Sequence, residues 1–305
     1  MRVLVTNDDG IEAEGIRVLA AALVARGDDV VVAAPDTDQS GCGASLGPLA
    51  PDAPIGARRL EVEGLEGAEC WAVSGPPALC VLAGRLGGFG AAPDLVVSGI
   101  NAGLNTGRAI LHSGTVGGAL TAQNFGMSGL AVSVAVGDPW RWDTAARVAM
   151  DVIDLVIQAA PRTVVNLNVP SVGYDELAGL RWARLAPFGE VRAASATHTG
   201  DGLQVVLEAT GVELPPDTDQ GMVANGFAAV TSLVGIAEVW PADGGDLGGD
   251  VDDVTELGQP GPGGGVGEAT VVERLVPGAP LHPGHRVPGE SPASTLRRPD
   301  RAAAE

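Results

Sequence analysis

Short apolar runs alternate with amphipathic stretches over the first 170 residues, as expected for buried parallel strands joined by helices. The predicted strands are 3–5, 30–34, 95–97, 130–134 and 163–167. The predicted helices run from Ile16 to a stop at Gly27, over 76–86, from a cap at Ser113 to Phe125, and over 142–159. This alternation predicts an α/β fold with a Rossmann-like, doubly wound, mostly parallel sheet.

The pattern changes after Pro170. Short alternating segments at Leu180–Leu185 and Leu203–Leu207, with a last strand at Phe227–Leu233, predict a β-hairpin extension rather than further strand–helix units. From Pro241 onward the chain is rich in Gly, Pro and Asp, and too little apolar surface remains to offset the entropy of ordering. We therefore expect a core at 1–170, a hairpin part of the same domain at 171–240, and a disordered tail at 241–305.

The composition excludes several kinds of phosphate chemistry. Hydrophobic residues make up 45% of the chain but aromatic residues only 3%, so the core must consist of Val, Leu, Ile and Ala. All 18 basic residues are Arg. The absence of Lys excludes a Walker-type phosphate loop, a Schiff-base lysine and the lysine of a phosphate-receiving signalling domain.

The charge favours a cation as ligand and disfavours polyanions. A formal net charge of -20 repels nucleic-acid backbones and anionic membranes, so we expect neither a nucleic-acid polymer nor a membrane as partner. Asp8 and Asp9 stand where a secretory leader would be apolar, and three cysteines without a CxxC motif are typical of reduced thiols. We expect a cytoplasmic protein.

Polar residues follow three of the predicted strands. Asp8 and Asp9 follow the first, Ser40 lies beyond the second, and Asn101 follows the strand at 95–97. Ligands collect at the carboxyl ends of parallel strands, and carboxylate, hydroxyl and amide oxygens suit Mg²⁺ or Mn²⁺. The alternative for the Asp pair alone is a turn that caps a helix.

A glycine-rich segment at 98–115 predicts a phosphate site without lysine, because backbone N–H groups in such a loop and at a helix start can bind phosphate. The plainer alternative is tight turns with Ser113 as an ordinary helix cap. His112 lies in this segment and is interpreted as a half-buried loop histidine without a catalytic part, with a role in the site as the alternative. Asp217 and Asp219 are interpreted as a turn, with a hinge or a pocket lip as the functional alternative.

Several widely spaced motifs together resemble the SurE family of survival-protein nucleotidases over roughly residues 1–235. They are VTNDDGIEAEGI, QSGCGAS, SGPPALCV, SGINAGLNTG followed by HSGTVGGA, NLNVP and DTDQGMVANGF. The resemblance implies a metal-dependent phosphomonoesterase that hydrolyses nucleoside 5'- and 3'-monophosphates, with short polyphosphate as a further substrate of some members.

The resemblance also implies the residues of the site. One divalent ion per subunit, Mg²⁺ or Mn²⁺, would lie on Asp8, Asp9, Ser40 and Asn101, with Asp8 and Asp9 as the catalytic pair. The substrate phosphate would contact Asn105, Ser113, Gly114 and Thr115. Family members form homodimers or homotetramers by exchanging an arm, which here would be the hairpin region after Pro170.

The chain departs from the family pattern at four places, which are Arg108, His112, Gln123–Asn124 and the stretch 181–190. These departures leave open a nucleotide-binding protein with weak or lost catalysis. A phosphate-receiving signalling domain would need a third Asp and a Lys. A calcium-dependent nucleoside hydrolase would need a further Asp in the first loop, and it would release base instead of phosphate.

Overall fold

The computed structural model describes residues 1–50, 52–187, 191–209 and 214–237, so the predicted tail at 241–305 lies outside the described residues. In chain order the elements are β1 (Arg2–Thr6), α1 (Glu14–Arg26), β2 (Asp29–Pro35), β3 (Ala57–Leu60), β4 (Ala68–Val73), α2 (Pro77–Arg85), β5 (Leu95–Ala102), η1 (Gly107–His112), α3 (Gly114–Asn124), β6 (Ser128–Val134), α4 (Trp142–Gln158), β7 (Val164–Val169), η2 (Tyr174–Glu176), β8 (Gly179–Trp182), β9 (Val191–Thr199), β10 (Gly202–Ala209), α5 (Asp219–Ala224) and β11 (Phe227–Leu233). The labels η1 and η2 denote 3-10 helices.

A nine-stranded sheet forms the centre of the fold, in the order β3-β4-β2-β1-β5-β6-β7-β11-β8. The six strands from β4 to β7 run parallel, which confirms the predicted α/β class. At one end β3 is antiparallel to β4, and at the other β11 is antiparallel to β7 while β8 runs parallel to β11. The β9–β10 hairpin is a separate two-stranded antiparallel sheet.

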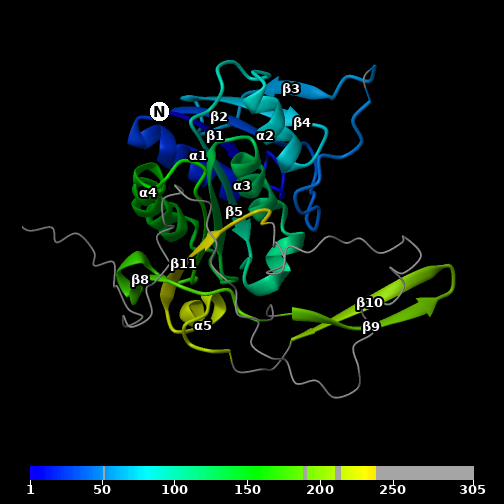
Figure 1. Cartoon of the computed structure of the whole chain (residues 1–305), viewed down its shortest axis with the longest axis vertical. Helices are drawn as coiled ribbons and strands as arrows, with labels where there is room; N and C mark the ends of the chain where they lie inside the picture. The colour runs from blue at the N-terminus through cyan, green and yellow to red at the C-terminus, as the bar shows by residue number, and fades with distance from the viewer. Residues whose placement is uncertain (51, 188–190, 210–213, 238–305) are drawn as a thin grey trace, which may run out of the picture. The chain divides into compact units, whose positions relative to one another are not determined.

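Helices cover both faces of the central sheet, as Figure 1 shows. The apolar sides of α1 and α4 are buried on one face, and those of α2 and α3 are buried on the other. Each fully buried Leu or Ile of these layers contributes roughly 1.5–3 kcal/mol by removal from water. Among the described residues no helix has both the length and the apolar character to cross a lipid bilayer.

Local signals fix the ends of the two helices that border the site. Helix α1 stops where Gly27 adopts φ 93°, a left-handed conformation that glycine accepts without steric cost. Helix α3 begins after Ser113, whose Oγ accepts the backbone N–H of Val116 at 3.1 Å. Both predicted ends are confirmed.

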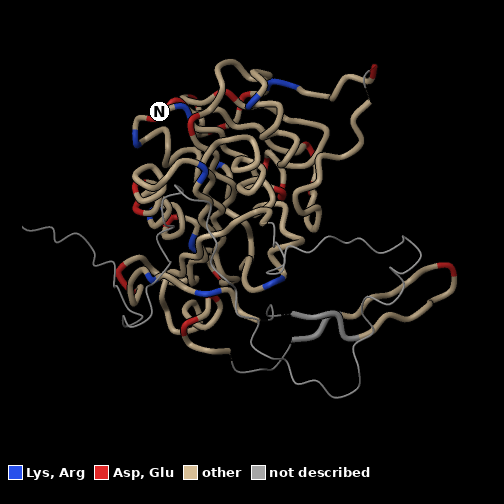
Figure 2. The backbone as a smooth tube through the Cα atoms, in the orientation of Figure 1, with Lys and Arg blue, Asp and Glu red and all other residues tan. Residues whose placement is uncertain are grey.

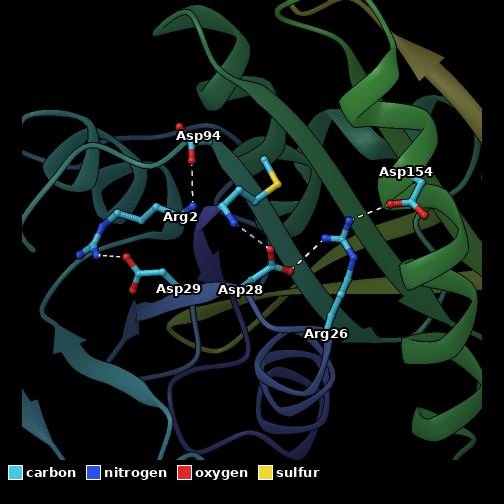
Figure 3. A network of polar contacts seen from close by, with 7 residues as sticks. Arg2, Arg26, Asp28, Asp29, Asp94 and Asp154 are labelled. Atoms are coloured by element: carbon cyan, nitrogen blue, oxygen red, sulfur yellow. Dashed lines mark hydrogen bonds and ion pairs between the residues drawn. The ribbon is translucent and has the colours of Figure 1, made fainter.

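Charged contacts join strands and helices at the amino edge of the sheet (Figure 3). The backbone N–H of Arg2 donates to Asp94 Oδ2 at 2.8 Å. The guanidinium of Arg26 bonds Asp28 at 2.9 Å and Asp154 at 2.7 Å, which ties α1 to α4. Exposed pairs of this kind contribute up to about 1 kcal/mol each. They lie at the opposite edge from the carboxyl ends of the strands, where the candidate site lies.

The structure corrects several sequence-based expectations about strands. Strands β3, β4 and β9 were not predicted. The sequence of β3 is ARRL, and its polar, solvent-exposed positions provide no apolar pattern. The segment Leu180–Leu185, expected to belong to a hairpin, instead contains most of β8, which pairs in parallel with β11 at the sheet edge. Asp219 lies at the start of α5 rather than in a simple turn.

Candidate active site

The order of the strands reverses beside β1. From β1 the chain moves to β2 and then β4 on one side, and it returns to β5 on the other side of β1. Such a reversal leaves a crevice at the carboxyl ends of the two central strands, which is where open α/β sheets bind ligands. Asp8 and Asp9 follow β1, and Asn101 lies at the end of β5.

Hydrogen bonds from the side chain of Asn7 hold the turn that follows β1. The side chain of the buried Asn7 donates to Gly10 O at 3.0 Å and accepts the Gly10 N–H at 3.2 Å. Gly10 has φ 102°, a conformation that residues with a Cβ rarely adopt. Asp8 and Asp9 are therefore displayed on a fixed turn. No local pattern in the sequence indicated this role of Asn7.

Thr115 links Asp8 to Asn101. Its hydroxyl is completely buried, donates to Asp8 Oδ1 and lies within hydrogen-bond distance of Asn101 Oδ1 at 3.2 Å. The amide nitrogen of Asn101 donates to Gly103 O at 2.8 Å, which leaves its oxygen on the side of Asp8. Two predicted metal ligands from different strands thus lie together around one hydroxyl.

Ser40 lies at the same edge, in the loop after β2. The neighbouring Gln39 N–H donates to the backbone oxygen of Asp8 at 2.8 Å, which brings this loop against the turn after β1. Hydrogen bonds from the Ser40 side chain and N–H lower the pKa of Asp38, the latter bond at 2.7 Å. The Ser40 side chain is exposed to solvent.

The electrostatics of the acidic pair differ between its members. Asp8 is only 3% exposed, whereas Asp9 is half-buried. Burial, together with the charges of Asp8 and Asp38, raises the pKa of Asp9 to about 6, although a backbone hydrogen bond at Ala102 opposes the shift. Neighbouring negative charges disfavour the ionised form of a carboxyl group, and a bound cation would offset this repulsion.

The donor set fits a hard divalent cation. Among the described residues no three His, Cys, Asp or Glu side chains gather as a ligand set. The predicted donor set instead consists of two carboxylates with neutral oxygens from Ser40 and Asn101, and the structure joins Asp8 to Asn101 through Thr115. Mg²⁺ and Mn²⁺ prefer oxygen ligands, and Mg²⁺ usually keeps several waters, so two carboxylates with two neutral oxygens suffice.

The start of α3 packs directly on Asp8. A Cβ on Gly114 would lie 2.7 Å from Asp8 Cβ and 2.7 Å from Cys42 Sγ, so only glycine allows this approach. Burial, and then the charge of Asp8, raise the pKa of the Cys42 thiol to about 11. Cys42 is therefore protonated at neutral pH and unsuited to act as a nucleophile. The N–H groups that begin α3 lie beside the candidate metal ligands.

A network of asparagines fixes Asn105, the first predicted phosphate contact. The Asn105 carbonyl accepts from Asn166 Nδ2 and Asn168 Nδ2, each at 2.8 Å, and its N–H donates to Asn168 Oδ1 at 2.8 Å. Its own side-chain amide donates to Ser133 Oγ at 2.9 Å. The NLNVP motif thus positions the loop that follows β5, a role that the sequence did not reveal.

The two residues of the glycine-rich segment that depart from the SurE-family pattern both lie at the surface. Arg108 and His112 belong to η1 and are exposed. The carbonyl of His112 accepts the Gly43 N–H at 3.1 Å, so its backbone is tied to the loop after β2. In the described part of the chain no carboxylate lies within ion-pair distance of Arg108.

The sequence profile of the family described as "Survival protein SurE" matches residues 3–189. The chain belongs to the SurE family. The matched span contains every predicted metal and phosphate position of the site.

Curated proteins similar to this SurE-family chain are described as 5'-nucleotidases. The "5'-nucleotidase SurE" of Mannheimia succiniciproducens is 37% identical over 246 residues, which cover 76% of this chain and 92% of that protein. The "5'-nucleotidase SurE" of Parasynechococcus marenigrum is 40% identical over 188 residues, which cover 61% and 70% respectively. The crystal structure of the SurE protein from Aquifex aeolicus matches with a TM-score of 0.66 and 31% identity, covering 78% of this chain and 95% of that one.

Proposed function

We propose that this SurE-family protein is a metal-dependent 5'-nucleotidase. It hydrolyses nucleoside 5'-monophosphates, and also 3'-monophosphates and short polyphosphate, to release inorganic phosphate. The observation that carries the proposal is the cluster of Asp8, Asn101 and Thr115 at the strand reversal, beside the N-terminus of α3. The relatives named 5'-nucleotidase SurE support the substrate class.

Each part of the site has a task in this reaction. Asp8, Asp9, Ser40 and Asn101 would hold Mg²⁺ or Mn²⁺. The cation would neutralise phosphate oxygens and lower the pKa of a water molecule. Backbone N–H groups at Gly114 and Thr115 would hold the transferring phosphate, because the start of a helix favours an anion. Asn105 and Ser113 complete the predicted phosphate contacts.

The two carboxylates divide the work by exposure. Asp8 is buried and committed to Thr115, so its task is to hold the cation in place. Asp9 is the more open of the pair, so we assign to it the acceptance of a proton from the attacking water. Bonding of the water oxygen to phosphorus breaks the bond between phosphorus and the nucleoside oxygen, and this oxygen takes up a proton from solvent, so that the nucleoside and inorganic phosphate leave.

The reaction is distinguished from nucleoside hydrolysis by its products. With AMP as substrate, the protein is expected to release inorganic phosphate and adenosine. Release of free adenine with retained ribose phosphate would place the chemistry at the glycosidic bond and contradict the proposal. Tight AMP binding without either product would identify the catalytically inactive alternative.

Arg108 is expected to select substrates with additional negative charge. It is an exposed cation within η1, between Asn105 and Ser113 in the sequence. Acidic positions are spread over the chain (Figure 2). A guanidinium can pair with a second phosphate. Arg108→Asp should therefore lower the ratio of polyphosphate to AMP hydrolysis on the order of tenfold, the worth of one hydrogen bond to a charged group.

The matched control is Arg58→Asp, which removes an exposed arginine on the edge strand β3. It should leave the ratio unchanged. An equal ratio in Arg108→Asp and wild type would exclude a substrate-selecting role for Arg108.

The β9–β10 hairpin is proposed as the arm that joins subunits into a homodimer or homotetramer. Leu203 and Val205 lie on one face of β10 and are exposed by 60% and 52%. Apolar side chains presented in this way favour burial against another copy of the chain.

Leu203→Asp combined with Val205→Asp is therefore expected to reduce the mass measured by light scattering to that of a smaller assembly. Gln204→Asp, on the other face of the same strand, serves as the control for added charge. An unchanged mass in the double variant would assign subunit contacts to another surface.

A further inference from the structure

Asp219 is a buried carboxylate that reaches into the glycine-rich segment from a distant part of the chain. Its side chain is completely buried at the start of α5. Oδ2 accepts the N–H of Gly107 at 2.8 Å, across 112 positions of sequence. Oδ1 accepts the N–H groups of Ala186 and Gln220, both at 2.9 Å. One side chain thus joins η1, the loop after β8 and α5.

The partners of Asp219 are all neutral. Within the described residues no arginine lies at ion-pair distance from it. Burial raises the pKa of this carboxyl group, while hydrogen bonds from the backbone N–H groups of Gly107, Ala186, Gln220 and Asp219 itself oppose the shift. Withdrawing a carboxylate from water is costly, and the hydrogen bonds that offset this cost all come from backbone N–H groups, so the side chain fixes these backbone segments relative to one another.

Asp219 acts on the same short segment as the asparagine network. Asn166 and Asn168 hold the carbonyl of Asn105, and Asp219 holds the N–H of Gly107 two residues further on. This segment connects the end of β5, which carries Asn101, to the start of α3. Hydrogen bonds at both Asn105 and Gly107 restrict the backbone of this segment.

We propose that Asp219 is a positioning residue for phosphate binding: by holding Gly107 it fixes the segment that runs from Asn105 to Ser113. The inference rests on the proposed function of the site. It concerns phosphate rather than the cation, because Asp8, Asn101 and Thr115 are joined to one another without Asp219. A displacement of about 1 Å at a substrate contact can cost on the order of a hundredfold in rate.

Asp219→Asn tests the bond to Gly107 with little change of volume. The amide oxygen can still accept from Ala186 and Gln220, but the amide nitrogen then faces the Gly107 N–H, donor against donor. The control is Asp217→Asn, two positions away, where the side chain is 52% exposed and pairs with Arg184 at 3.6 Å.

The kinetic experiment compares both variants with the wild-type protein on AMP. For Asp219→Asn we expect kcat/KM to fall on the order of tenfold to a hundredfold and inhibition by inorganic phosphate to weaken. The Mn²⁺ concentration that gives half-maximal activity, and the rise in melting temperature caused by Mn²⁺, should match wild type. Asp217→Asn should match wild type throughout. The inference would be overturned if Asp219→Asn matched Asp217→Asn and wild type both in kcat/KM and in inhibition by phosphate.

Amide hydrogen exchange in the wild-type protein gives a readout that depends neither on activity nor on the folding of a variant. In the wild-type protein the Gly107 N–H should exchange slowly, because Asp219 accepts it in a buried position. Asp219→Asn should speed exchange at Gly107 without altering the protection of β1 and β5. Rapid exchange of Gly107 in wild type would overturn the inference. An inactive wild-type protein with a protected Gly107 would instead contradict the proposed function.

Discussion

Asp8→Asn and Asp9→Asn are each expected to reduce metal-dependent phosphate release from AMP by about a hundredfold or more, the cost of removing one preorganised electrostatic group. The change from carboxylate to amide retains the size of the side chain but removes the charge that holds the cation. The fold should persist, because relief of the repulsion between two adjacent carboxylates compensates for altered hydrogen bonds. Steady-state kinetics with Mg²⁺ and Mn²⁺, with melting curves, provide the measurement.

Glu12→Gln is the matched control for these variants. Glu12 is an exposed acid three positions beyond Asp9, so its replacement removes the same charge from the same loop. It should retain turnover within about twofold, as expected for an exposed charge that is screened by solvent. Full activity in both Asp variants would show that the reaction does not use this acidic pair.

Thr115→Val is expected to weaken the metal site without touching a ligand. The substitution retains the shape of the side chain and removes the hydroxyl that bonds Asp8 Oδ1 and lies 3.2 Å from Asn101 Oδ1. Loss of a partner that orients metal ligands typically costs about 10- to 100-fold in metal affinity or activity. Titration of Mn²⁺ by calorimetry and by the shift in melting temperature measures this loss directly.

Two further variants separate the hydroxyl from the packing. Thr115→Ser restores the hydroxyl and should recover most of the Mn²⁺ affinity. Thr121→Val removes another buried hydroxyl of α3. This hydroxyl donates to Gly117 O at 2.7 Å rather than to the acidic pair, so its loss should leave Mn²⁺ binding unaltered. If Thr115→Val binds Mn²⁺ as tightly as wild type, Asp8 and Asn101 are positioned by other contacts.

The strands and helix ends that could be predicted are those that a short stretch of sequence determines. Continuous apolar runs identified the central strands because these strands are buried on both faces, and Gly27 and Ser113 marked helix ends through backbone conformation and capping. Strand β3 could not be predicted, because an exposed edge strand with the sequence ARRL carries no apolar period. Leu180–Leu185 was misassigned because alternation does not reveal which strand a segment will pair with.

The candidate metal ligands could be predicted from the residues alone because they follow strands. The general rule that ligands bind at strand ends singled out Asp8, Asp9 and Asn101, whereas the direction of the Thr115 hydroxyl depends on the packing of α3 against the turn that follows β1. Asp219 was interpreted as part of a turn. Its bond to Gly107 spans 112 positions, and no local pattern indicates a contact at that separation.

The most direct test of the central claim is phosphate release from 5'-AMP by the full-length protein, first freed of metal with a chelator and then supplied with Mg²⁺ or Mn²⁺. We expect no release in the chelator, recovery when the cation is restored, and adenosine and inorganic phosphate as the products. Release that continues in the chelator, or no release with either cation, would contradict this claim.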